Sequence, residues 1–330
     1  MKAVLLDGFG GRDVLQMGEI ETPSAAQSQV LIKVMATSVN RADIVQREGS
    51  YPPPKGDSEI LGLEVAGVIE DIGPGVSGWQ RGDRVMSLIG GGGYAEYAVA
   101  YANHLISIPE SMTFEQAACV CETYITAYLN VFMIGGLKDH ESVLLHGGGG
   151  GVNSAATQLC KTLTPKAKVM VTASPPKIER VKQLGTDLVI DYKGQDFVEQ
   201  VKAYTDNKGV DLILDHIGAK YLVPNMAALA IKGRLVVIGV MGGAKAELNI
   251  GLMMVKRLQL IGSVLRARPV EEKARITAEF TKIVLPKLAD RTLVPLIHAT
   301  LWLDDVGKAH EMMEASEHFG KIVLRVASEK

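Results

Sequence analysis

The chain has 330 residues, 47% of them hydrophobic and 22% charged, as in ordinary globular proteins. This length allows two domains with separate cores. The net charge of −2 argues against a strongly basic nucleic-acid-binding protein, and three cysteines are too few for a disulfide framework. No stretch approaches the roughly 20 uncharged apolar residues of a membrane span. The first residues resemble neither a signal nor a transit peptide, so we expect a cytoplasmic protein.

Residues 1 to about 122 contain short β-type runs separated by turn residues. Such runs occur at 30–34, 65–69 and 94–99. Glycine- and proline-rich segments lie between them, at 52–54, 73–75 and 90–93. This pattern predicts a predominantly β domain.

From about residue 123 to residue 265 the pattern changes to an alternation of strands and helices. Strands are expected at 142–146, 167–172, 187–191, 210–215, 234–239 and 258–264. Right-handed crossovers between such strands produce a parallel sheet with helices on both faces. We therefore predict an α/β fold with a doubly wound parallel sheet.

Five consecutive glycines occupy the junction between the first of these strands and the first helix. A helix start offers unpaired N–H groups, and residues without Cβ let a pyrophosphate approach the backbone closely. We therefore expect Gly147, Gly150, Gly151 and Val152 to contact a dinucleotide. A glycine run alone also fits an ordinary turn, but the alternation on both sides favours the dinucleotide.

The second strand of this region indicates which dinucleotide binds. NAD-binding versions of the motif carry an acid about 20 residues after the glycines, whereas this strand ends at Ser174 without one. Ser174 and Lys177 suit a 2′-phosphate, because a hydroxyl and an ammonium attract the group that a carboxylate repels. Tyr192, after the third strand, is placed to lean toward the same phosphate. We therefore predict NADPH, although Lys177 also fits a solvated helix residue and Tyr192 a packing residue.

The last segment of the chain is too short to form a separate domain with its own core. Helices are expected near 271–288 and 304–315, and strands near 294–298 and 321–325. We expect this segment to return to the first domain and pack on it.

Seven short segments, in order along nearly the whole chain, match the motifs of one known family. They lie at 40–43, 46–54, 60–64, 91–93, 122–127, 212–215 and 319–324. In these segments the chain resembles the zinc-free medium-chain dehydrogenases/reductases of the quinone oxidoreductase (zeta-crystallin-like) branch. The resemblance implies a GroES-like β-rich catalytic domain (1–122 and 266–330), a Rossmann NADP-binding domain (123–265) and a cofactor in the cleft between them.

Metal ligands are missing where zinc-dependent relatives have them. Those relatives place a His before the Glu that corresponds to Glu64, and a Cys near the position of Asn40; here Leu63 stands in place of the His. Three cysteines cannot form a four-cysteine zinc site. We therefore expect no metal.

The expected reaction follows from this absence. Without a Lewis acid, the group that accepts the hydride must already be electrophilic, so we predict NADPH-dependent reduction of quinones.

Three residues are expected at the substrate because of the resemblance. It implies that Asn40, Asp43 and Tyr51 face the nicotinamide and the substrate, with the Tyr51 hydroxyl donating to a quinone oxygen. From the residues alone, Asn40 and Asp43 also fit turn or capping positions, and Tyr51 fits a loop anchor before the prolines.

Further cofactor contacts follow by position in the resemblance. They are Thr126, Gly239, Met241, Ser263, Leu265 and, at the phosphates, Lys321. The glycine loops among them also fit simple turns. One departure stands out, because Asn153 occupies the third glycine position of the dinucleotide motif. We expect the helix to lie farther from the sheet there, or Asn153 to turn toward the cofactor or a backbone partner.

Two alternatives to quinone reduction remain. The same fold reduces activated double bonds in α,β-unsaturated ketones or enoyl thioesters. Relatives of zeta-crystallin also include NADPH-sensitive RNA-binding and structural lens proteins, although nine Tyr, six Phe and two Trp at net charge −2 offer no evident RNA platform. An exposed edge strand around 259–262 would be a liability. Pairing of this strand with its symmetry mate gives the homodimer that the resemblance implies, so we expect a homodimer.

Overall fold

The computed structural model describes residues 1–327, and the chain divides into two compact units. Unit 1 comprises residues 1–125 together with the chain from residue 265 onward. Unit 2 comprises Thr126–Val264. The division on the N-terminal side falls within helix α3 (Cys121–Tyr128).

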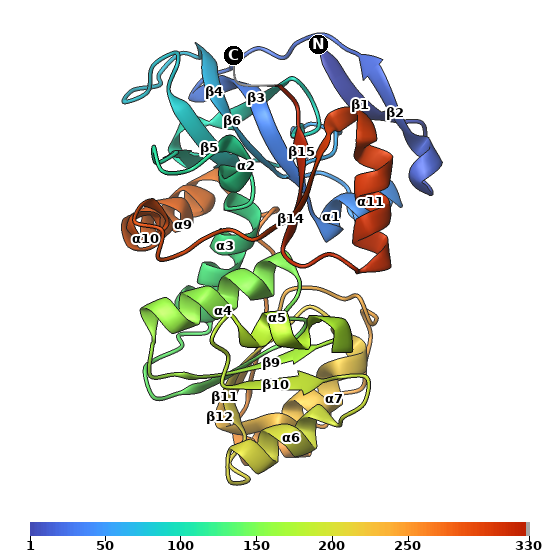
Figure 1. Cartoon of the computed structure of the whole chain (residues 1–330), viewed down its shortest axis with the longest axis vertical. Helices are drawn as coiled ribbons and strands as arrows, with labels where there is room; N and C mark the ends of the chain where they lie inside the picture. The colour runs from blue at the N-terminus through green and yellow to red at the C-terminus, as the bar shows by residue number, and fades with distance from the viewer. Residues whose placement is uncertain (328–330) are drawn as a thin grey trace. The chain divides into compact units, whose positions relative to one another are not determined.

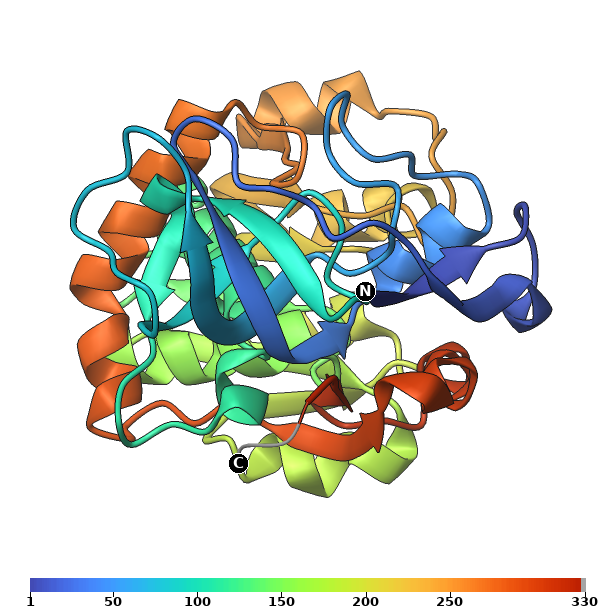
Figure 2. The same cartoon turned by 90° about the horizontal axis from the view of Figure 1, so that it is seen from above.

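A mainly antiparallel sheet forms the centre of unit 1 (Figure 1). Its strands run in the order β14-β15-β3-β4-β5-β7, and β6 also pairs with β3. Their bounds are β3 Gln29–Val39, β4 Glu64–Ile72, β5 Arg84–Leu88, β6 Tyr97–Tyr101, β7 Leu105–Ser107, β14 Ile297–Trp302 and β15 Lys321–Arg325. A separate hairpin pairs β1 (Lys2–Leu6) with β2 (Leu15–Glu19). Figure 2 shows the blue-to-cyan strands of the sheet curving around one another.

Both ends of the chain contribute to one core of unit 1. Val4, Leu61, Tyr94, Val306 and Ile322 belong to a single buried cluster. The two ends share this core because β15 pairs with β3, which aligns Ile322 with Val39 in an antiparallel register. The C-terminal segment therefore contributes to the core of unit 1.

Helices of 3 to 14 residues connect the strands of unit 1. They are η1 Arg12–Val14, α1 Arg41–Arg47, η2 Ala102–His104, α2 Phe114–Ala117, α9 Val270–Ile283, α10 Leu285–Ala289, η5 Leu303–Asp305 and α11 Val306–Ala315.

Unit 2 contains a parallel sheet with the strand order β10-β9-β8-β11-β12-β13. The bounds are β8 Ser142–Leu145, β9 Lys168–Ala173, β10 Leu188–Asp191, β11 Val210–Asp215, β12 Leu229–Val237 and β13 Gln259–Gly262. Every residue of β8 is buried, as expected for a central parallel strand covered on both faces. When the six strands are numbered as they appear along the chain, their order in the sheet is 3-2-1-4-5-6, which is the arrangement of dinucleotide-binding sheets. The predicted α/β class and doubly wound sheet are therefore confirmed.

Helices cover both faces of this sheet, with α4 and α5 on one side and α6 and α7 on the other (Figure 1). The bounds of the unit 2 helices are α4 Gly151–Leu163, α5 Ile178–Lys182, α6 Phe197–Tyr204, α7 Ala219–Ala228 and α8 Ile250–Lys256, with the π-helix η3 Leu129–Ile134 and the 3-10 helix η4 Pro175–Lys177.

Prolines shift two elements from their predicted bounds. The strand expected near 294–298 begins at Ile297 instead, because Pro295 has no N–H to donate to a ladder. The single helix expected near 271–288 is two helices, α9 and α10, and Pro286 lies in the first turn of the second.

Candidate functional site

The glycine run of unit 2 forms a tight turn between β8 and α4. Gly147 has φ +75°, and a Cβ added there would lie 2.8 Å from His216 Cε1. The N–H groups of Gly147 and Gly148 donate to Thr172 O at 3.0 and 2.9 Å. Gly150 is the extended residue directly before α4, a helix of 13 residues. As at any helix start, the first N–H groups of α4 have no intrahelical partners. This geometry matches a phosphate-binding helix N-terminus.

Three predicted cofactor residues lie together at the carboxyl ends of β9 and β10. Ser174 directly follows β9 and precedes η4, and Tyr192 follows β10 and donates its N–H to Ala173 O at 3.3 Å. Lys177 reaches back to the glycine turn, since a Cβ added at Gly149 would lie 2.3 Å from Lys177 Cδ. Because β9 pairs with both β8 and β10, these residues and the glycine turn lie at the same edge of the sheet. No carboxylate follows β9 directly, because Ala173 and Ser174 occupy that position.

Asn153 turns toward a backbone partner, which was one of the outcomes expected for it. Its Nδ2 donates to His146 O, the residue before the glycine turn. Its Oδ1 is buried without a hydrogen bond in the described part of the chain. The side chain thus fills the space that a glycine would leave between α4 and β8.

A nicotinamide dinucleotide fits the residues present in unit 2. The Thr126 hydroxyl is buried and has no partner within residues 1–327, which is costly unless a ligand supplies one. Gly239 and Met241 lie in the loop after β12, and Ser263 follows β13, with its N–H donated to Val237 O at 3.0 Å. These positions lie at the carboxyl ends of the parallel strands, where ligands of doubly wound sheets bind.

Leu265 belongs to unit 1, where it is buried directly before Arg266. Gly151 and Val152 are the first two residues of α4 and are half-buried.

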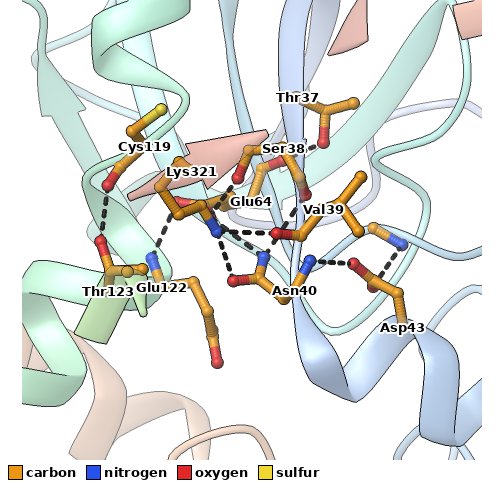
Figure 3. Close-up of polar contacts among 12 residues, drawn as sticks. Thr37, Ser38, Val39, Asn40, Asp43, Glu64, Cys119, Glu122, Thr123 and Lys321 are labelled. Carbon is orange, nitrogen blue, oxygen red and sulfur yellow. Dashed lines mark hydrogen bonds and ion pairs between the residues drawn. The ribbon is translucent and has the colours of Figure 1, made fainter. Parts of the chain in front are cut away.

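A buried cluster of polar side chains surrounds Glu64 in unit 1 (Figure 3). Glu64 is fully buried at the start of β4, and its Oε1 lies 3.0 Å from Lys321 Nζ of β15. Ser38 Oγ donates to the same oxygen at 2.6 Å and Asn40 Nδ2 at 3.1 Å. Lys321 Nζ also donates to Asn40 Oδ1 and, at 3.1 Å, to Val39 O. Lys321, expected at the cofactor phosphates, thus lies in a buried ion pair with 3% of its surface exposed.

Asn40 is committed to the same cluster through both ends of its amide. Its Oδ1 accepts from Lys321, and its Nδ2 donates to Glu64. Asn40 also precedes α1, where its N–H donates to Asp43 Oδ2 at 2.7 Å. The structure therefore favours the capping interpretation of Asn40. Because its Oδ1 already accepts from Lys321, this oxygen has at most one acceptor position left for a ligand.

Asp43 lies in the core, where the expectation that it faces the substrate does not hold. It is 0% exposed, and its carboxyl accepts from the N–H groups of Asn40 and Gly62 and from the Tyr94 hydroxyl, at 2.7, 3.1 and 3.0 Å. Burial raises the pKa of Asp43 to about 6, and these hydrogen bonds limit the rise. Asp43 therefore ties α1 to the 60–64 segment.

A hydrogen-bonded chain continues from Asp43 through Tyr94 and His310 to Arg47. His310 Nε2 lies 3.2 Å from the Tyr94 hydroxyl, and His310 Nδ1 lies 3.2 Å from Arg47 Nη1. Because Arg47 can only donate, Nδ1 is the acceptor. Burial, together with the charge of Arg47, lowers the pKa of His310 to about 3, so the ring is neutral and Nε2 carries the proton. Nε2–H then donates to Tyr94, and Tyr94 donates to Asp43.

Tyr51 is held by Arg266 at the surface of unit 1. The guanidinium carbon of Arg266 lies 5.0 Å from the Tyr51 ring centroid, and Nη1 donates to Tyr51 O at 3.3 Å. Arg266 also donates to Gly90 O at 2.6 and 2.8 Å and to Gln46 Oε1 at 2.7 Å. The Tyr51 ring is half-buried, and its hydroxyl forms no hydrogen bond within the described residues. This hydroxyl is therefore available to a ligand.

Glu122 is a candidate that the site prediction from sequence missed, along with Arg266. The N–H of Glu122 donates to Glu64 Oε2 at 2.9 Å, and its half-buried side chain points away from the Lys321–Glu64 pair (Figure 3). Burial raises the pKa of Glu122 to about 8, with a further contribution from the charge of Glu64. Glu122 lies within the matched segment 122–127 and Arg266 directly follows Leu265, but a sequence motif does not reveal which side chain lacks a partner or which one fixes a neighbour.

Among residues 1–327 no group of three or more His, Cys, Asp or Glu side chains is arranged to hold a metal. Leu63, at the position where zinc-dependent relatives place a ligand, is 1% exposed and packs in the core. No helix in the described part of the chain is long and apolar enough to span a bilayer.

Comparisons with known proteins agree with this architecture. Residues 26–110 match the alcohol dehydrogenase GroES-like domain, and residues 151–282 match the family described as zinc-binding dehydrogenase. The human quinone oxidoreductase is 33% identical over 98% of this chain and 97% of its own length. The zebrafish synaptic vesicle membrane protein VAT-1 homolog is 31% identical over 98% of this chain and 69% of its own length. A mycobacterial protein solved in complex with NADPH is 27% identical, with a TM-score of 0.88 over 99% of this chain and 100% of its own.

Proposed function

Because this chain belongs to the medium-chain dehydrogenase/reductase family of oxidoreductases, we propose that it reduces quinones with NADPH. The relatives named quinone oxidoreductase support this acceptor class. NADPH supplies a hydride when bound, and the protein supplies binding, orientation and electrostatics.

The preference for NADPH is supported by the residues after β9. A 2′-phosphate would meet the Ser174 hydroxyl and the Lys177 ammonium beside the glycine turn, with no carboxylate directly after the strand. The Thr126 hydroxyl is the orphaned group that the bound dinucleotide would satisfy.

The observation that carries the proposed acceptor class is the half-buried Tyr51 phenol, fixed by Arg266 and free to donate. A carbonyl oxygen that gains negative charge as hydride arrives is the acceptor such a donor stabilises. Leu63 supports metal-independent chemistry, because zinc-dependent relatives carry a ligand at its position and an aliphatic side chain cannot coordinate a metal. Quinones suit such a site, since hydride addition leaves a charge delocalised onto oxygen.

Reduction of α,β-unsaturated ketones is the second candidate, because the same free hydroxyl would receive an enolate oxygen. The test is oxidation of NADPH and of NADH against ortho-quinones, para-quinones and enones, with oxygen uptake recorded. We expect quinones to be the best acceptors and NADPH the better donor. Equal rates with NADH would overturn the cofactor assignment, and faster reduction of enones than of quinones would overturn the acceptor assignment.

A binding role in place of catalysis predicts a different result. If the protein is an NADPH-sensitive RNA-binding protein, a filter-binding assay should detect retention of AU-rich RNA that NADPH reverses. We expect no retention, because the net charge of −2 supplies no excess of cations for phosphate neutralisation.

A further inference from the structure

Two half-buried residues of unit 1 carry polar groups that have no hydrogen-bond partner among the described residues, and they share an electrostatic environment. They are the Tyr51 hydroxyl and the Glu122 carboxyl, neither of which forms a hydrogen bond or ion pair within residues 1–327. The charge of Glu122 acts on Tyr51, and both groups interact with the guanidinium of Arg266. The neighbouring carboxyls of Glu64 and Asp43 instead accept several hydrogen bonds each from the protein.

The backbone holds Glu122 in a fixed position. Glu122 is the second residue of α3, directly after the buried Cys121, and its N–H donates to Glu64 Oε2 at 2.9 Å. Glu64 is in turn fixed by Lys321 and Ser38. A carboxyl whose backbone is fixed in this way, and which has no hydrogen-bond partner of its own among residues 1–327, is suited to a ligand.

The environment of Glu122 keeps its carboxyl protonated at neutral pH. Burial raises its pKa to about 8, and the negative charges of Glu64 and Asp43 raise it while the positive charges of Lys321 and Arg266 lower it. The titratable and charged groups that act on it from the surrounding elements are Asp43 (α1), Tyr51 (the loop after α1), Glu64 (β4), Cys121 (α3), Arg266, Lys273 (α9) and Lys321 (β15). All three cations are themselves engaged by protein acceptors: Lys321 by Glu64, Arg266 by Gly90 O, and Lys273 by Arg266 O at 3.3 Å.

We propose that Glu122 is the general acid of this site, donating its proton to the acceptor oxygen while the Tyr51 hydroxyl holds that oxygen in place. This role rests on the proposed reductase function. Hydride addition leaves an oxyanion on the quinone, or an enolate on an enone. The O–H bond of Glu122 then breaks, its electron pair stays on the carboxylate, and the proton forms the new O–H bond of the product. Water returns a proton to Glu122 before the next turnover.

The charge state of Glu122 can be tested without cofactor or substrate. We expect infrared difference spectra of the full chain to show a protonated carboxyl band that titrates near pH 8. This band should disappear in Glu122→Gln and persist in the control Glu110→Gln, which changes an exposed glutamate. A band unchanged in Glu122→Gln would overturn the proposal.

The catalytic role has its own readout in kcat/KM as a function of pH. The wild-type rate should fall as pH rises above about 8, because only the protonated acid donates. Glu122→Gln should lose at least about 100-fold in rate together with this descending limb. Glu122→Asp, which keeps an ionisable group, should retain a descending limb, and Glu110→Gln should match the wild type.

Failure of this role differs from failure of the reductase function. A wild-type chain that oxidises NADPH with quinones, and a Glu122→Gln variant with the same rate and pH profile, would overturn the role of Glu122 alone. A wild-type chain that oxidises no NADPH with any quinone or enone would overturn both.

Discussion

Lys321 and Glu64 form an ion pair that solvent hardly reaches, with side chains 4% and 0% exposed. Removing one member of a buried pair leaves the other charge uncompensated, which costs about 3–5 kcal/mol. We therefore expect Lys321→Met to lower the free energy of unfolding by about that amount, measured by urea denaturation.

A neighbouring ion pair on the same strand provides the control for Lys321→Met. Arg325 pairs with Glu115, but their side chains are 46% and 21% exposed. Arg325→Met should therefore cost no more than about 1 kcal/mol. The double variant Glu64→Gln/Lys321→Met should be more stable than Lys321→Met, because no buried charge remains unpaired. If the two single variants lose the same stability, the pair is not buried as described.

The Tyr51 hydroxyl offers a second test at a single residue. Tyr51→Phe removes a donor that forms no hydrogen bond within the described chain, so the fold should keep its stability. Loss of one hydrogen bond to developing charge is worth about 1.5–3 kcal/mol, so kcat with quinones should fall roughly 10- to 100-fold. The dissociation constant of NADPH, measured by fluorescence titration, should not change. Tyr97→Phe is the matched control, and an equal loss in both variants would contradict the role of Tyr51.

The raised pKa of Glu122 also makes a prediction about stability. The pKa is 4.5 for an ordinary glutamate and about 8 in this fold. Between these values the folded chain holds a proton that the unfolded chain releases. The contribution of Glu122 to stability is thus fully present below pH 4.5 and is lost as pH rises through about 8, by at most about 1.4 kcal/mol per pH unit.

Glu122→Gln removes this pH dependence, because glutamine does not titrate. In urea unfolding the variant should therefore gain stability relative to the wild type as pH rises from about 5 to about 9. Parallel stability curves for the two proteins would show that Glu122 has an ordinary pKa in the folded chain.

For single residues, the predictions from sequence agree with the structure where the role of the residue depends only on its neighbours along the chain. Gly147 needs a positive φ, and the absence of an acid after β9 is a fact of the sequence. The environment of Asn40 and Asp43 could not be predicted in the same way. It is completed by Lys321 and Tyr94, which other strands bring from distant parts of the chain.

At the scale of elements, the turn between β8 and α4 and the turn after β9 act together through Lys177. Its side chain lies against Gly149, at the helix N-terminus that would hold the phosphates. A charge-assisted contact to a 2′-phosphate is worth about 1.5–3 kcal/mol. We therefore expect Lys177→Ala to weaken NADPH binding roughly 10- to 100-fold and to leave NADH binding unchanged in calorimetric titrations.

Lys182→Ala is the control for Lys177→Ala, because Lys182 lies on α5 and pairs there with Glu179. It should leave the affinity for NADPH unaltered. If Lys177→Ala weakens the binding of NADPH and of NADH equally, Lys177 does not distinguish the 2′-phosphate from a hydroxyl.

The strand and helix pattern predicted most elements, since hydrophobic runs and glycines are local signals. Some boundaries differed without a proline, as in β12, which begins at Leu229 instead of 234, but two of the errors occurred where a proline decided a boundary. Strand β14 begins only at Ile297, after Pro295. The expected single helix is interrupted at Val284, between α9 and α10, shortly before Pro286. The preference of a proline for a strand edge or a first helical turn depends on the partner strand or helix, which the sequence pattern does not contain.

At the scale of the whole molecule, the alternation of elements predicted the parallel sheet of unit 2 because each crossover is local in sequence. The resemblance to known proteins implied that both chain ends build unit 1. The residue pattern alone indicated only that the last segment was too short to stand apart. Pairing of β15 with β3 joins segments from opposite ends of the chain, and no local signal encodes such a register.

The exposed apolar surface of unit 2 leads to a prediction about assembly. Strand β13 is the last strand of its sheet, and Met254 and Val255 on the adjoining α8 are 69% and 79% exposed. Val240, Met241, Ile250 and Val264 are also large, exposed and close in sequence. Edge strands with apolar surroundings are commonly covered. A second copy of the chain, paired through β13 about a two-fold axis, would cover this surface.

We therefore expect the wild-type chain to sediment as a dimer, and Val255→Lys to shift it toward the monomer, because the variant buries an unpaired charge in the interface. Phe9→Lys is the control, since Phe9 is similarly exposed at 73% but lies on unit 1. It should leave the dimer intact. Affinity for NADPH should persist in both variants, because neither residue lies at the glycine turn. A monomeric wild type, or a Val255→Lys variant that remains dimeric, would show that β13 and α8 do not form the interface.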